Sequence, residues 1–316
     1  MARFVTVTLN PALDRSLTLA RLTIGEVLRA RSVASGAGGK GINVARVLRT
    51  LGADVVALGF AGGRVGEALR AHLDAEDIAH AFVDISPAET RCATILLEDG
   101  TGRQTVVNEE GPAVEPEQVE AFAALLERAA RGAQWVVFSG SAPPGLTPAD
   151  YARLIASAQA AGARVMVDAS GALLWRAAAS RPSVIKPNLN ELRDSGVLKE
   201  GDWRDGPAGA AQALRRLCDA QVAAVTLGAE GALLASEGGV WRAQPPRIDV
   251  VSAVGSGDSF AAGLVWALSA APGDFAEALR LASACGTANA AVMAAGGCSR
   301  EQIEAISGKI RVVREA

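Results

Sequence analysis

The sequence is poor in the residues that usually bind nucleic acids. Aromatic residues make up only 4% of the 316 residues, and 31 Lys and Arg face 34 Asp and Glu, which gives a net charge of −3. Nucleic-acid binding depends on clustered cations for the phosphates and on aromatic rings for the bases. The composition therefore argues against nucleic acid as a partner.

Cysteine and histidine are also scarce. There are two histidines, and the four cysteines include no CxxC pair. This spacing does not fit a zinc cage or a disulfide framework. It predicts small buried thiols in a reducing compartment.

The sequence has no long apolar run that fits a membrane segment. Residues 1–11, MARFVTVTLNP, lack the basic and apolar regions of a signal peptide and predict a first strand. The longest uncharged stretch, residues 281–299, is too rich in Gly, Ser, Thr and Asn to span a bilayer. We expect a cytoplasmic protein with no membrane partner.

The hydrophobic half of the sequence is arranged for a layered α/β fold. Short apolar runs alternate with Ala- and Leu-rich helical stretches, which is typical of parallel strands covered on both faces. The pattern predicts one domain over residues 1–316, a doubly wound, mostly parallel sheet sandwiched by helices. Strands are expected at 4–9, 55–60, 135–138, 165–167, 184–186 and 222–227, and helices at 42–51, 116–130, 148–161, 208–218, 259–269 and 275–291.

Two segments depart from this rhythm. Residues 16–33 alternate in polarity, and residues 90–108 have the pattern of a hairpin with a turn at 98–100. Strands with one uncovered face often form a small accessory sheet. We expect a β lid or an oligomer interface from about 15–33 and 90–108, although a surface hairpin without a role fits the periodicity equally well.

The densest glycine cluster is GAGGKG at residues 36–41, followed by a predicted helix that carries Asn43. Gly36, Gly38 and Gly41 satisfy GxGxxG, but no apolar strand precedes them, so nicotinamide binding is only an alternative. Backbone N–H groups beside Lys40 and Asn43 suit a polyhydroxylated or phosphorylated small molecule. A tight turn that merely needs positive φ would also explain the glycines.

A second glycine turn precedes another predicted helix. Gly255, Ser256 and Gly257 would present N–H groups to an anion at the helix start, with Asp258 in the first turn. Asp258 would also suit a simple helix cap. An anion hole beside a base is what phosphoryl transfer to an alcohol needs.

Two further segments follow predicted strands, KPNLNE at residues 186–191 and TLGAEG at 226–231. The carboxyl ends of strands form the usual ligand crevice of open α/β sheets. Glu191 on its own would equally be an ordinary exposed helix residue.

Seven motifs in order along the chain resemble those of the ribokinase-like, PfkB-type carbohydrate kinases. They are NPALD at 10–14, GGKGINVARVL at 38–48, SGSAPPG at 139–145, DASG at 168–171, KPNLNEL at 186–192, TLGAEGAL at 226–233 and VGSGDSFAAGL at 254–264. The likeness spans nearly the whole chain and is greatest for the branch of 1-phosphofructokinases and tagatose-6-phosphate kinases.

The resemblance implies roles for individual residues. Asp258 matches the catalytic base, and Gly255, Ser256 and Gly257 match the anion hole. The sugar-phosphate side is implied to consist of Asp14, Arg29, Gly38, Gly39, Lys40, Asn43 and Arg91. The nucleotide side is implied to consist of Lys186, Asn188, Glu191, Thr226, Gly228, Glu230, Gly231 and Asn289.

The resemblance also implies ATP with Mg²⁺, linked through Asn188 and Glu191 without a direct metal ligand, and a homodimer formed through the β lid. It makes fructose 1-phosphate the first expected acceptor and tagatose 6-phosphate the second. Fructose 6-phosphate comes third, because relatives specific for it carry GGGG where this chain has GGKG. Val27, where some relatives have lysine, leaves the phosphate site with fewer cations. A catalytically silent sugar-phosphate or nucleotide sensor is the alternative from another class.

Overall fold

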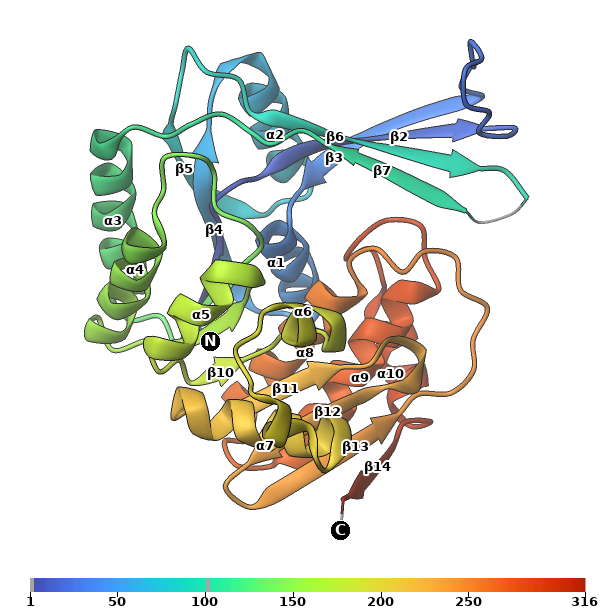
Figure 1. Ribbon diagram of the computed structural model, residues 1–316. Helices are drawn as coiled ribbons and strands as arrows, with labels where there is room; N and C mark the ends of the chain where they lie inside the picture. Colours follow the sequence, from blue (N-terminus) through green and yellow to red (C-terminus); the bar gives the residue numbers. More distant parts are fainter. Residues whose placement is uncertain (1–2, 101–102, 316) are drawn as a thin grey trace.

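The computed structural model describes residues 3–100 and 103–315. The strands within these residues form two β-sheets (Figure 1). The larger sheet has ten strands in the order β14-β13-β12-β11-β10-β9-β8-β1-β4-β5. Its strands are β1 (Arg3–Thr8), β4 (Asp54–Ala61), β5 (Ala79–Asp84), β8 (Trp135–Ser139), β9 (Arg164–Asp168), β10 (Val184–Ile185), β11 (Val222–Thr226), β12 (Ala232–Ser236), β13 (Gly239–Gln244) and β14 (Arg311–Arg314).

The strands from β11 to β5 are parallel, whereas β12, β13 and β14 continue the sheet antiparallel. Because helical crossovers join parallel strands, helices cover both faces of the sheet. The helices are α1 (Lys40–Thr50), α2 (Gly63–Ala75), α3 (Pro116–Ala130), α4 (Pro148–Ala160), α5 (Gly171–Ala179), α6 (Leu189–Asp194), α7 (Gly206–Cys218), α8 (Ser256–Ala270), α9 (Phe275–Ala290) and α10 (Arg300–Ser307).

Successive side chains of the central strands enter two different cores. Phe4 packs into the core that contains α1, α8 and α9, whereas Val5 packs into the core that contains α3 and α4. Trp135 and Val136 on the neighbouring strand divide in the same way. This alternation is the period-two geometry of a strand with two buried faces. It confirms the prediction of a doubly wound, mostly parallel sheet sandwiched by helices.

The smaller sheet has the order β3-β2-β6-β7. Its strands are β2 (Ala12–Leu19), β3 (Ser32–Gly38), β6 (Arg91–Glu98) and β7 (Gln104–Asn108). In Figure 1 it extends away from the α1 end of the large sheet toward the loops that precede α8. Side chains at its far end contact those loops, since the hydroxyl of Ser252 lies 3.4 Å from Oε1 of Gln104.

Several elements differ from the sequence-based expectation. The glycines at 36 and 38 lie in strand β3 and not in a turn, because β3 pairs with β2 through Gly38. That strand belongs to the small sheet, so the cluster lacks the core-strand context of a nicotinamide-binding turn. The segment between β2 and β3 is not a strand. Helices α2, α5 and α10 and the strands β5, β12, β13 and β14 were not among the expected elements, whereas the expected hairpin is present as β6 and β7.

Candidate active site

The turn before α8 exposes backbone donors. Gly255 adopts φ 80°, and a Cβ there would lie 2.6 Å from the Cβ of Ala295, so only glycine fits. The N–H groups of Gly255, Gly257 and Asp258 donate no hydrogen bond within residues 3–100 and 103–315. Free N–H groups at the start of a helix form a site for an anion.

Asp258 lies in the first turn of α8 and is buried, with 5% of its surface exposed. Nδ2 of Asn43 donates a hydrogen bond of 2.8 Å to its Oδ2. Burial raises the pKa of Asp258 to about 6, and the charge of Asp168 acts in the same direction. The bond from Asn43 and the charges of Lys40 and Lys186 oppose this rise. The carboxyl group is therefore poised to accept a proton near neutral pH.

Helix α1 supplies Asn43 and Lys40 to the same place. The helix begins at Lys40 because Gly39, with φ 120°, turns the chain out of β3. Nζ of Lys40 lies 3.3 Å from Oε1 of Glu191 and 3.9 Å from Oδ1 of Asp168. The charge of Asp168 is the main cause that raises the pKa of Lys40, so the ammonium stays protonated. The two glycine clusters thus meet, although Asn43 and Asp258 are 215 residues apart.

Lys186 forms a buried ion pair with Asp168. Nζ of Lys186 lies 3.1 Å from Oδ2 of Asp168, and the two side chains are 3% and 1% exposed. A Cβ on Gly257 would lie 3.6 Å from Nζ of Lys186, so the ammonium faces the start of α8. Asp168 was not among the residues expected in the site. Its signal was the DASG motif, whose aspartate is the last residue of strand β9.

Asn188 and Glu191 bind each other across the first turn of α6. The Glu191 N–H donates to Oδ1 of Asn188 at 2.8 Å, and the Asn188 N–H donates to Oε2 of Glu191 at 2.9 Å. This capping box orients Oε1 of Glu191 toward Lys40. Thr226 is bridged to Asn188 at the ends of the neighbouring strands.

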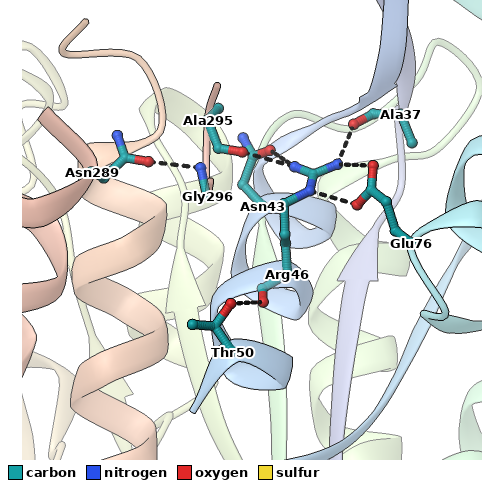
Figure 2. A network of polar contacts seen from close by, with 8 residues as sticks. All are labelled: Ala37, Asn43, Arg46, Thr50, Glu76, Asn289, Ala295 and Gly296. Carbon is teal, nitrogen blue, oxygen red and sulfur yellow. Dashed lines mark hydrogen bonds and ion pairs between the residues drawn. The ribbon is translucent and has the colours of Figure 1, made fainter. Parts of the chain in front are cut away.

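The remaining residues expected on the nucleotide side differ in exposure. Gly228 and Glu230 are exposed after β11, and Gly231 follows them with φ 97°. Asn289 is fully buried, and its Nδ2 donates to the carbonyl of Val254 and to Oγ of Ser256. Its Oδ1 accepts the N–H of Gly296 (Figure 2). Asn289 thus braces the turn before α8, and its contact with a nucleotide stays a prediction.

Asp14 lies at the base of the small sheet. Burial raises its pKa to about 6, and the charges of Arg91 and Arg46 oppose the rise. A Cβ on Gly38 would lie 2.1 Å from Oδ1 of Asp14, which explains why glycine occupies that position in β3.

The structure places the two expected arginines differently. Arg91 begins β6, and its Nε donates to the carbonyl of Asn10 at 3.1 Å. Arg29 is exposed in the segment between β2 and β3. This segment joins β2 to β3 at the end of the strand pair where Thr18 is opposite Ser32. Asp14 is opposite Gly36, nearer the other end of the pair. Arg29 is therefore not brought to Asp14 within this chain.

We predict that Gly38→Ala destabilises the protein by about 1–3 kcal/mol, because the added methyl group would overlap the half-buried Asp14 carboxylate. Urea unfolding measures the change. Gly36→Ala is the matched control, since a Cβ at 36 meets nothing within 4 Å, and we expect it to stay within about 0.5 kcal/mol of wild type. Equal effects of the two substitutions would contradict this account of Gly38.

Comparisons with known proteins agree with this geometry. The family model described as pfkB family carbohydrate kinase matches residues 8–302. Phosphofructokinase-2 from Escherichia coli, solved with potassium, is 30% identical with a TM-score of 0.89, covering 98% of this chain and 99% of its own. A possible 1-phosphofructokinase from Thermotoga maritima is 27% identical with a TM-score of 0.84, covering 99% and 100%.

Ribokinase from Thermotoga maritima, at 18% identity and a TM-score of 0.75 over 97% of this chain and 99% of its own, shares the fold. The family match extends across both glycine clusters and every strand that carries a charged residue of the site. The chain belongs to the pfkB family of carbohydrate kinases and is an ATP-dependent sugar phosphotransferase.

Proposed function

We propose that the protein phosphorylates fructose 1-phosphate on its C6 hydroxyl to give fructose 1,6-bisphosphate. The observation that carries the chemistry is the buried Asp258 carboxylate beside the free N–H groups at the start of α8. Asp258 takes the hydroxyl proton while the oxygen attacks the γ-phosphorus of ATP. The bond to the β–γ bridging oxygen breaks, and ADP leaves.

The cations of the site offset the charge of two phosphorylated ligands. Lys40 and Lys186 approach different carboxylate oxygens of Asp168, and Lys186 faces the turn that would hold the transferred group. Phosphoryl transfer needs positive charge at this point, because negative charge accumulates on the equatorial oxygens. On the sugar side, Asp14, Gly38, Gly39 and Asn43 would contact the hydroxyl groups, and Arg91 would contact the existing phosphate.

The residues fit a magnesium ion that arrives with ATP. Both carboxylate oxygens of Asp168 are buried and accept no hydrogen bond from the described part of the chain, and Oε1 of Glu191 points into the same space. Oxygen donors of this kind suit Mg²⁺ held through water and phosphate oxygens. No cluster of three acidic, His or Cys residues suited to a metal occurs among the described residues. When bound, the ion would neutralise phosphate charge, with Asp168, Asn188 and Glu191 around it.

The choice of fructose 1-phosphate rests on Lys40 and on the Thermotoga neighbour. Tagatose 6-phosphate is the second candidate. Fructose 6-phosphate is the third, and it is the ligand in a structure of Escherichia coli phosphofructokinase-2 that is 29% identical to this chain.

The small sheet is proposed to be a lid that also forms a homodimer. Exposed apolar side chains lie on its strands, at Val33 (56% exposed) and Val107 (56%), and on the segment that joins β2 to β3, at Ile24 (97%) and Val27 (98%). Several large apolar side chains on one accessory element favour an interface. The phosphofructokinase-2 of Escherichia coli has been solved in a tetrameric inhibited form.

We predict that Asp258→Asn lowers kcat by a factor of about 10²–10⁴, because the amide cannot accept the hydroxyl proton. Nucleotide affinity should change only a few-fold, as calorimetry would show. Asp274→Asn, at the exposed cap of α9, is the matched control and should keep full turnover. Near-normal turnover of the Asp258 variant would disprove the assignment of the base.

We predict that kcat/KM is highest for fructose 1-phosphate in a panel with tagatose 6-phosphate and fructose 6-phosphate. A coupled assay of ADP release measures all three under the same conditions. A higher value for another acceptor would reassign the substrate. Binding without ADP release for every acceptor would instead support the silent sensor.

We predict a dimer at micromolar concentration, measured by light scattering after size exclusion. Val107→Lys should shift the protein toward monomer, because it places a charge in the proposed interface. Leu217→Lys changes a similarly exposed apolar residue on α7 and should leave the mass unchanged. A monomeric wild type would contradict the proposal.

A further inference from the structure

Arg46 on α1 is the centre of a polar network beside the site (Figure 2). Its side chain is only 18% exposed. Nε donates to Oε2 of Glu76 at 2.6 Å, and Nη2 donates to Oε1 of Glu76 at 3.0 Å and to the carbonyl of Ala37 at 2.9 Å. Nη1 donates to Oδ1 of Asn43 at 3.0 Å and to the carbonyl of Ala295 at 2.8 Å.

This set of bonds uses all five N–H groups of the guanidinium, one acceptor for each. The acceptors come from β3, from α1, from the residue that caps α2 and from the loop after α9. A planar group with five fixed partners has a single orientation. Lysine, with three donors and no fork, could not make the same set.

The fixed guanidinium determines how the amide of Asn43 is oriented. Asn43 is 5% exposed and lies between Arg46 and Asp258. Its oxygen accepts from Arg46, which leaves its nitrogen to donate to Asp258. The reversed amide would place its oxygen against a carboxylate and its N–H groups against a guanidinium, and both contacts are repulsive.

We propose that Arg46 is a positioning residue for phosphoryl transfer, because it holds the Asn43 amide in the orientation that donates to Asp258. The inference rests on the proposed function, in which Asp258 is the base. Nothing in the family likeness drawn from the sequence assigns this role to Arg46, and its partners lie up to 249 residues away.

The consequence of losing Arg46 follows from the groups around Asp258. The carboxylate is faced by Asp168 from β9, Lys40 and Asn43 from α1, and Lys186 after β10. Without Arg46 the amide can turn its oxygen toward Asp258, and only a protonated carboxyl can then donate to it. The pKa of Asp258 therefore rises, and the deprotonated base is present only at higher pH.

The first test compares the pH dependence of kcat/KM in wild type and Arg46→Lys. We expect the acidic limb to move up by about one pH unit, which is about a fivefold loss at pH 6 and a small loss above pH 8. Ionisation of the sugar phosphate near pH 6 is common to both proteins and cancels in the comparison. An unmoved limb in an active variant would overturn the proposal.

Two control variants separate positioning from structural support. Glu76→Gln weakens the ion pair of Arg46 but leaves the Asn43 bond, so it should lower stability without moving the limb. Arg49→Lys changes the exposed ion pair with Asp77 one turn further along α1 and should move neither. A limb that shifts equally in Glu76→Gln would show that Arg46 acts only through the fold. Arg46→Gln is the second variant should the lysine variant fail to fold.

The second test does not depend on activity. A raised pKa means that protonated Asp258 stabilises the fold at low pH, and that this stability is lost as pH rises through the folded pKa. The measurement compares the free energy of unfolding of wild type with that of Asp258→Asn across pH. Because the amide of the variant does not titrate, we expect wild type to lose stability relative to the variant as pH rises from 3.8 to about 6.

When Arg46→Lys is added to both wild type and Asp258→Asn, the pH range over which their stability difference changes should extend to higher pH. Identical windows would overturn the positioning role even in an inactive enzyme. Full turnover of Asp258→Asn, in contrast, would overturn the proposed function and leave this measurement interpretable.

Discussion

The site depends on a buried balance of charge. The carboxylates of Asp168 and Asp258 are both buried, and each alone would carry a large desolvation cost. Lys186 is buried against Asp168, and Lys40 lies between Asp168 and Glu191. Removing Lys186 would leave the buried Asp168 with only the more distant ammonium of Lys40, which is far more costly than the loss of an exposed ion pair. The same ammonium groups are available to incoming phosphates.

The fold brings this balance about by placing strand ends together. Asp168 ends β9, Lys186 follows β10, and Thr226 ends β11, and these three strands are parallel neighbours in the large sheet. Helices α1 and α8 then add Lys40, Asn43 and the turn with free N–H groups from segments far away in the sequence. Each of these residues belongs to a separate element, and the order of the strands in the sheet brings them together.

The sequence predicts elements whose signals are local. Helix α3 spans residues 116–130 as expected, because Pro116 suits its first turn and Glu115 and Gln118 form its capping box. The hydrophobic periodicity of β12, β13 and β14 does not predict how these strands pair. The glycine at 38 has a tertiary cause, the close approach of Asp14, so a pattern of glycines alone suggested a turn instead of a strand.

The residues of the site also divide into those with a local sequence signal and those that depend on tertiary contacts. Asp168 and Arg46 lie in recognisable motifs as Asp258 and Lys40 do, but they act through partners from other segments that the motifs do not specify. Arg29 is the opposite case. The sequence implied that it contacts the sugar phosphate, but it lies on an exposed segment of this chain.

Strand β3 ends at Gly38 and helix α1 begins at Lys40, so one residue, Gly39, separates the small sheet from the helix that carries Lys40 and Asn43. Along this segment, any swing of the small sheet relative to α1 must pivot at Gly39. Its backbone is in a region that other residues rarely adopt, and a Cβ there would lie 2.6 Å from Cγ2 of Thr8. The pivot is thus anchored against β1, so a shift of the small sheet relative to the large sheet would be transmitted to the helix that carries Asn43, the residue that donates to Asp258.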